Sequence, residues 1–146
     1  MQISTFSRYG LRALVRLYNI IKIEGKPVSV KRIAEEENIS IKYLENIFSI
    51  LRRSNLVVAV RGKFGGYKLS KPASEITAFM VIESLEGKIA PVNCILHPEE
   101  CDNDHEKCTV RPLWQELNQK VETLLKSKNI EELAENKSVS EGIYNL

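Results

Sequence analysis

The residues best suited to metal chemistry lie together in one short segment, 94–108. The segment holds all three cysteines of the chain, with six residues between neighbours: Cys94, Cys101 and Cys108. It also holds both histidines, His97 and His105, together with five acidic residues. Thiolates are strong ligands for zinc, copper(I) and iron–sulphur clusters. The segment therefore predicts a metal site built on the three thiols.

The spacing of these cysteines leaves the kind of site open. It is not the paired Cys-x-x-Cys of a zinc knuckle, so zinc is possible but not indicated. Direct oxidation of the thiols is a second alternative. Three unrelated cysteines in a mobile loop would be unusual, because cysteine is uncommon and all three lie beside both histidines.

The cellular compartment of the protein affects whether its cysteines are expected to bind metal or to form a disulfide. Its start, Met1-Gln2-Ile3-Ser4, lacks the basic region and apolar run of a signal peptide. No apolar stretch approaches the length needed to cross a bilayer. We therefore expect a cytoplasmic protein, in which an odd number of cysteines favours metal or redox chemistry over a structural disulfide.

A second group of functional candidates lies between Ser29 and Ser70. The pattern predicts a short helix capped by Ser29, a turn at Asn38 and a second helix capped by Ser40. An apolar stripe on the second helix leaves its polar residues for the other side: Lys42, Tyr43, Glu45, Asn46, Ser49, Arg52 and Arg53. This mixture suits a DNA groove, because Asn pairs with adenine, Glu accepts from cytosine, and Tyr and Lys reach phosphates.

A predicted hairpin follows this helix. Residues 56–60 form a run with high strand propensity, and residues 67–70 alternate as a strand should. The loop between them carries three glycines, two basic residues and an exposed aromatic residue: Arg61, Gly62, Lys63, Phe64, Gly65 and Gly66. A basic, glycine-rich tip fits a narrow minor groove, where Arg61 or Lys63 would meet strong negative potential. Helix, turn, helix and hairpin in this order predict a winged helix-turn-helix.

The distribution of charge supports a DNA-binding first half. Residues 1–72 carry 14 Lys and Arg against 5 Asp and Glu, whereas residues 73–146 carry 7 against 14. A basic half beside an acidic half indicates one module that binds a polyanion and one with another role.

Helices are expected on both sides of this motif. The first runs from Ser4 or Thr5 to about Ile23 and carries a row of arginines, Arg8, Arg12 and Arg16, that suits phosphate contacts. A fourth helix starts at Thr77 and ends at Gly87, and residues 88–111 then form a long irregular loop. A fifth helix begins at Pro112 and presents a seam for a partner helix: Trp114, Leu117, Val121 and Leu124. We expect this seam to join two copies of the chain.

The predicted fold is thus mostly α, a winged helix-turn-helix with a two-stranded wing and a C-terminal dimerisation helix. The predicted divisions are a DNA-binding domain (1–87), the cysteine loop (88–111), the dimerisation helix (112–128) and a tail (129–146). The tail shows one short helical pattern at residues 130–134 and is expected to fray.

Several of these motifs together resemble a known family. They are Arg8-Tyr9-Gly10-Leu11-Arg12, the run 39–45, Leu51-Arg52-Arg53, Arg61-Gly62 through Gly65-Gly66-Tyr67, Leu85-Glu86-Gly87, and the cysteine loop ahead of Trp114. In this combination the chain resembles the Rrf2 family of bacterial winged-helix regulators over nearly its whole length. The resemblance implies a homodimeric transcription regulator, most simply a repressor, that binds a palindromic operator in double-stranded DNA.

The resemblance also implies roles for individual residues. The family's DNA contacts would fall on Ser40, Lys42, Tyr43, Glu45, Arg52 and Arg61, with Gly65 and Gly66 shaping the wing. Cys94, Cys101 and Cys108 would bind an iron–sulphur cluster, most often of the 2Fe-2S type. To these DNA contacts the residue pattern adds Arg8 and Lys63.

The chain departs from the family at the fourth cluster ligand. The best-known iron–sulphur regulator of the family has a histidine three residues after the last cysteine, and here that position is Arg111, which cannot ligate. Other relatives use an acidic residue on the first helix of the partner subunit, where this chain offers Arg8. His105 is the first local candidate and His97 the second, followed by an acidic residue of the loop. Other members lack the cluster and bind a metabolic enzyme instead, so a zinc- or thiol-switched regulator and an enzyme-docking regulator are the alternatives. Catalysis is not expected, since no nucleophile–base set or phosphate-binding loop is present.

Overall fold

The computed structural model describes residues 1–101 and 104–136. Most of the elements are helices, and their bounds in chain order are α1 (Thr5–Glu24), α2 (Val30–Glu37), α3 (Ile41–Arg53), β1 (Val57–Val60), β2 (Gly66–Leu69), η1 (Ala73–Glu75), α4 (Ala78–Glu86), α5 (Asn93–Leu96), η2 (Pro98–Glu100), α6 (Arg111–Ser127) and α7 (Ile130–Glu135). The predicted fold class, mostly helical with a two-stranded wing, is confirmed. None of the helices in this described part of the chain combines the length and the hydropathy needed to cross a membrane.

Short polar side chains fix where the first helices begin. The hydroxyls of Ser4, Ser29 and Ser40 each accept a hydrogen bond from the backbone N–H three residues later, which satisfies a donor that the helix leaves unpaired. The turn between α2 and α3 contains Asn38 in the left-handed conformation, at φ 55° and ψ 48°. These starts and this turn are where the sequence predicts them.

The head of the molecule, formed by α1–α4, the wing and α7, encloses a single core. The largest fully buried apolar side chains come from all of these parts: Leu14, Leu17, Ile33, Leu44, Ile47, Phe48, Leu51, Val57, Ile76, Val81 and Ile130. The polar side of α3 is thereby turned away from the core, because its buried residues all fall on one stripe.

The wing consists of β1, β2 and the loop 61–65 that joins them. The two strands are antiparallel, and their register pairs Val57 with Leu69 and Val60 with Gly66. The backbone of Val28, just before α2, pairs with Tyr67, with N···O distances of 3.0 and 2.7 Å. This pairing anchors the base of the wing to the start of the helix-turn-helix.

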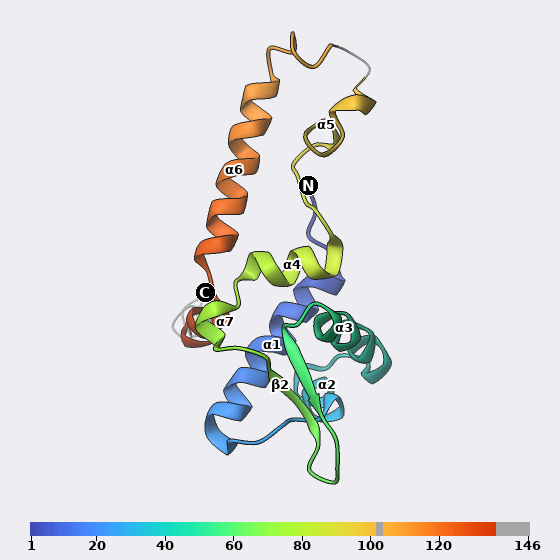
Figure 1. Ribbon diagram of the computed structural model, residues 1–146, viewed down its shortest axis with the longest axis vertical. Helices are drawn as coiled ribbons and strands as arrows, with labels where there is room; N and C mark the ends of the chain where they lie inside the picture. Colours follow the sequence, from blue (N-terminus) through green and yellow to red (C-terminus); the bar gives the residue numbers. More distant parts are fainter. Residues whose placement is uncertain (102–103, 137–146) are drawn as a thin grey trace, which may run out of the picture.

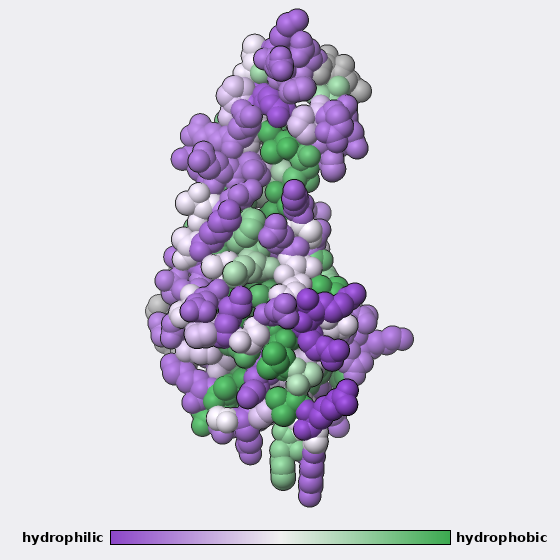
Figure 2. Space-filling view, viewed as in Figure 1, coloured by the Kyte–Doolittle hydropathy of each residue, from purple (hydrophilic) through white to green (hydrophobic). Residues whose placement is uncertain are grey.

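The arm, residues 88–127, extends away from the head at the end opposite the wing (Figure 1). Its cysteine segment is less irregular than predicted, since it contains the one-turn helix α5 and the 3-10 turn η2. The long helix α6 starts at Arg111, one residue before the predicted Pro112. Figure 2 shows hydrophobic side chains gathered between α5 and α6 on one face of the arm.

The chain returns from the arm to the head through α7. The side chains of Ile130 and Ala134 are buried, and the backbone N–H of Ile130 donates to the carbonyl of Ile76 at 2.9 Å. The expectation of a fraying tail is therefore wrong for residues 130–135, which pack against α1. Residues 137–146 lie outside the described part of the chain.

Candidate nucleic-acid interface and cysteine segment

The outer side of α3 carries charged side chains that are exposed to solvent. Lys42 and Glu45 lie in its first half, and Arg52 lies in its last turn. Within residues 1–101 and 104–136, Lys42 and Arg52 form no ion pair. A cationic side chain that is exposed and unpaired is available to a phosphate group at no cost in broken intramolecular contacts.

The N-terminus of α3 is held in place by α1. The ring of Tyr43, half-buried, packs edge-on against Phe6 and Tyr9, with ring centroids 5.4 and 5.7 Å apart. The Ser40 hydroxyl is the cap of the same helix end. Both predicted DNA contacts therefore also have a structural role, which is to fix the end of α3 whose backbone N–H groups favour an anion.

The wing loop presents two further basic residues, Arg61 and Lys63, both exposed and both without an ion pair in the described residues. Two glycines of this loop occupy positions where a side chain would clash. A side chain on Gly65 would meet the carbonyl oxygen of Val60, and one on Gly66 would meet the backbone of Val28. Gly66 also has φ 153°, which a side chain disfavours.

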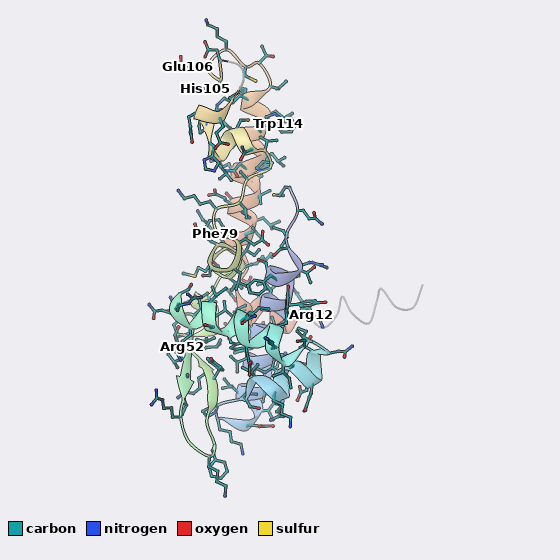
Figure 3. All side chains as sticks on the ribbon, turned by 90° about the vertical axis from the view of Figure 1, so that its right-hand side faces the viewer. Arg12, Arg52, Phe79, His105, Glu106 and Trp114 are labelled. Atoms are coloured by element: carbon teal, nitrogen blue, oxygen red, sulfur yellow. The ribbon has the colours of Figure 1, made fainter. Side chains whose placement is uncertain are left out.

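The sequence predicts that the arginines of α1 contact phosphates, but two of the three are paired with a glutamate of the protein itself. Arg12 and Arg16 both bond the carboxylate of Glu37 in α2, with N···O distances of 3.0 and 2.8 Å. Arg12 lies toward the opposite side of the head from Arg52 (Figure 3). Of the row, only Arg8 remains unpaired by carboxylates in the described residues, and it donates to the Thr5 hydroxyl at 2.7 Å.

The three cysteines all lie in the arm, and each is partly exposed. In the described residues, the set of three potential ligand atoms within 4.8 Å of one another comes from His97, Glu99 and Glu100, and no cysteine belongs to it. The predicted ligands Cys94, Cys101, Cys108 and His105 are thus close in sequence, but the fold does not gather them into one such group.

Hydrogen bonds order the base of this segment. Arg111, which replaces the histidine of the family's best-known iron–sulphur regulator, donates from Nη1 to the backbone carbonyl of Cys94 at 3.2 Å. This bond brings the backbone of Cys94 to the start of α6. That helix begins three residues after Cys108, the last cysteine. His97 pairs with Glu99 at 3.3 Å. The pKa of the Glu99 carboxyl is lowered, first by its own backbone N–H and also by His97.

The head and the base of the arm meet at Glu86, the last residue of α4. Its carboxylate accepts a hydrogen bond of 2.6 Å from the backbone N–H of Ser4, the cap of α1. Partial burial would raise the pKa of this carboxyl, but hydrogen bonds from Ser4 prevail and the pKa lies below its ordinary value. Sequence reasoning gives Glu86 no such role, because the two residues are far apart in the chain.

Comparison with known proteins decides the family. Residues 3–136 match the Rrf2 family model, described as an iron-dependent transcriptional regulator. The chain belongs to the Rrf2 family. The chain is a transcription regulator of that family, and such regulators bind DNA.

Individual relatives cover nearly the whole chain. IscR of Pectobacterium atrosepticum, an HTH-type transcriptional regulator, is 33% identical over 95% of this chain and 82% of its own length. The structure of CymR, the global cysteine regulator of Bacillus subtilis, is 38% identical, covers 92% of this chain and 97% of its own, and has a TM-score of 0.76. The structure of IscR from T. potens is 28% identical, with a TM-score of 0.74 over 93% of this chain and 88% of its own. The resemblance to these structures thus extends through the arm. The relatives include both IscR and CymR proteins.

Proposed function

We propose that this Rrf2 regulator binds a palindromic DNA operator as a homodimer and represses transcription under the control of an iron–sulphur cluster held in the arm. The observation that carries the DNA-binding part is the division of charges in the head. The exposed cations of α3 and the wing are unpaired in the described residues, whereas Arg12, Arg16 and Arg32 are bound to glutamates.

In this proposal α3 lies in the major groove and the wing lies in the adjacent minor groove. Glu45 accepts from a cytosine amino group, and Lys42 and Arg52 contact phosphates on either side. Arg61 and Lys63 follow the minor groove, where negative potential is greatest. The DNA backbone near the N-terminal end of α3 is contacted by Ser40, Tyr43 and Arg8.

The exposed apolar side chains of α6 support a dimer. Leu113, Leu117 and Leu124 are 57%, 38% and 58% exposed and share one stripe of the helix, because they are four and seven residues apart. Such a stripe on an extended helix is typical of a helix–helix interface. A two-fold pair of heads would then read two half-sites of a palindrome.

The donor set of the arm fits an iron–sulphur cluster in its chemistry. Cys94, Cys101 and Cys108 would supply three thiolates, and His105, or else His97, would supply the fourth ligand. When bound, such a cluster supplies one-electron redox chemistry and sensitivity to oxidants. The hydrogen bond from Arg111 to the Cys94 carbonyl supports this proposal, because it brings the backbone of Cys94 to the start of the helix that follows Cys108.

The contacts of Glu86 give a route from this segment to the DNA-binding surface. Glu86 holds the N-terminus of α1, and α1 in turn holds Tyr43 at the start of α3 through Phe6 and Tyr9. A change in the order of residues 88–110 would act on Glu86 first and on the position of α3 second.

The test is to purify the protein without oxygen and measure iron, sulphide and the visible spectrum. We expect a coloured protein with iron bound, and we expect Cys101→Ser to lose that colour. Equilibrium binding to a duplex enriched from a random-sequence pool is then measured before and after iron is removed with a chelator. A colourless, iron-free protein that reconstitution leaves unchanged would contradict cluster control.

The same experiment separates the alternatives. Zinc at one equivalent, or DNA binding that follows thiol oxidation without any metal, would identify a zinc- or thiol-switched regulator. Control by a docked metabolic enzyme stays a prediction that none of these observations tests.

A further inference from the structure

The tip of the wing carries an aromatic side chain that the DNA contacts proposed above do not use. Phe64 is 75% exposed, the second-highest value among the exposed large apolar side chains of the described residues. The other aromatic residue of the hairpin, Tyr67, packs against Phe48 in the core at a centroid distance of 4.8 Å. Tyr67 therefore anchors the hairpin, and Phe64 is not needed for that purpose.

The surroundings of Phe64 make the tip narrow and positively charged. Gly62 and Gly65 add no side chain on either side, and an added side chain on Gly65 would meet backbone atoms. The ammonium of Lys63 lies 5.7 Å from the centre of the Phe64 ring, and Arg61 is exposed on the same loop. Figure 2 shows apolar and polar side chains next to each other at the tip of the wing. An exposed aromatic ring thus stands next to one lysine, with an exposed arginine on the same short, glycine-rich loop.

We propose that Phe64 is an apolar wedge that enters the minor groove of the operator and partly unstacks one base step. This proposal rests on the DNA-binding function proposed above. Side chains that act in this way are typically Phe, Leu, Ile, Met or Pro, set among basic residues that hold the phosphates. Pyrimidine–purine steps such as TA and CA unstack most easily, so Phe64 selects such a step outside the bases that α3 reads.

The experiment uses the full chain and a duplex that the wild-type protein enriches from a random-sequence pool. Single adenines at the ends of the half-sites are replaced in turn with the fluorescent base 2-aminopurine, whose emission rises when it is unstacked. We expect binding to raise the emission at one step in each half-site. We expect Phe64→Ala to abolish that rise and to weaken binding about tenfold, the size of one lost aromatic–base contact.

Two further variants make the result specific. Phe64→Leu keeps an apolar wedge and should retain most of the emission change. Val58→Ala removes another exposed apolar side chain of the same hairpin, 41% exposed in β1, and should bind like the wild type. Melting curves should match for all three variants, since neither side chain is in the core.

The outcomes that overturn the proposal are distinct. Wild-type affinity with an unchanged emission pattern for Phe64→Ala would overturn the wedge and leave DNA binding intact. If the wild-type protein raises the emission at none of the positions, the wedge is likewise overturned and DNA binding stands. Failure of the wild-type protein to enrich any duplex would instead overturn the proposed function itself.

Discussion

Charge pairing divides the basic side chains of the head into two groups. Arg12, Arg16 and Arg32 are bound to glutamates of α1 and α2, whereas Lys42, Arg52 and Arg61 are exposed and unpaired among the described residues. The first group stabilises the crossing of α1 and α2, by modest amounts because the pairs are partly exposed. The second group is the one that we propose contacts DNA.

Removal of one member of the second group should weaken binding without unfolding the protein. We expect Arg61→Ala to lower the affinity for an enriched duplex about tenfold and to reduce the salt slope by about 1. The measurement is a fluorescence-anisotropy titration at several salt concentrations. Lys120→Ala, which removes an exposed charge from α6, is the matched control. Unchanged affinity of Arg61→Ala at moderate salt would exclude Arg61 as a contact.

Glu86 makes a prediction about pH. Its carboxyl pKa is lowered in the folded protein, so its contribution to stability is fully present above the pKa of the unfolded chain and is lost as pH falls through the folded-state pKa. We expect Glu86→Gln to reduce the free energy of unfolding by about 1 kcal/mol at pH 7 and by much less near pH 3. Urea unfolding at both pH values measures this difference. Glu83→Gln, exposed one turn earlier on α4, should show no such dependence; an equal loss at both pH values for Glu86→Gln would contradict the role.

The sequence alone predicts the identity of the exposed residues on α3 and the wing, because they follow from helical periodicity and turn chemistry. It does not predict the pairing of Arg12 and Arg16 with Glu37, since those contacts depend on how α2 crosses α1. The hydrogen bond between Ser4 and Glu86 cannot be predicted from the sequence either, because it depends on how α4 packs against α1.

At the scale of elements, the wing depends on its glycines. Gly66 has a positive φ and touches the Val28 backbone, whereas Gly62 has φ 117° with nothing within 4 Å of an added side chain. We expect Gly62→Ala to cost roughly 1–3 kcal/mol of stability from strain alone, and Gly66→Ala to cost more because it adds a clash. Urea unfolding of the two variants measures the difference. Equal stabilities would show that the Val28 pairing does not constrain the wing.

The elements of the head are largely predictable because local chemistry defines them. Serine and threonine caps, Asn38 in its turn and the strand pattern all act within a few residues of where they stand. Two short helices are less predictable: α5 was not predicted, whereas α7 matches the predicted helical pattern at residues 130–134 but its packing was not predicted. The helix α5 has only four residues, and α7 is stabilised by burial of Ile130 against the head, which no local pattern reveals.

At the scale of the whole molecule, the arm places the cysteine segment at the end opposite the wing (Figure 1). In Figure 3, His105 and Glu106 lie at the far end of the arm beyond Trp114, and Phe79 of α4 marks the side of the head that faces the arm. Within one subunit, a signal from the cysteines can reach the head through α4 or through α6 and α7, both of which connect to α1. The sequence predicts the helix seam, but the separation of the two sites along the molecule follows only from the three-dimensional arrangement.

The seam leads to a prediction about assembly. We expect Leu117→Asp to convert a dimer into a monomer, because a charge in an apolar helix interface is strongly unfavourable. Sedimentation velocity at micromolar concentration measures the change. Gln119→Asp adds the same charge to a different face of α6 and should leave the dimer intact. A wild-type chain that sediments as a monomer would contradict the proposed assembly.

The most direct test of the central claim is selection of DNA from a random-sequence pool by the full chain, compared with the double variant Lys42→Ala/Arg61→Ala. If α3 and the wing form the reading surface, the wild-type protein enriches a two-fold symmetric sequence with half-sites separated by whole helical turns, and the double variant does not. Enrichment of the same sequence by both proteins, or of no sequence by the wild type, would contradict the account.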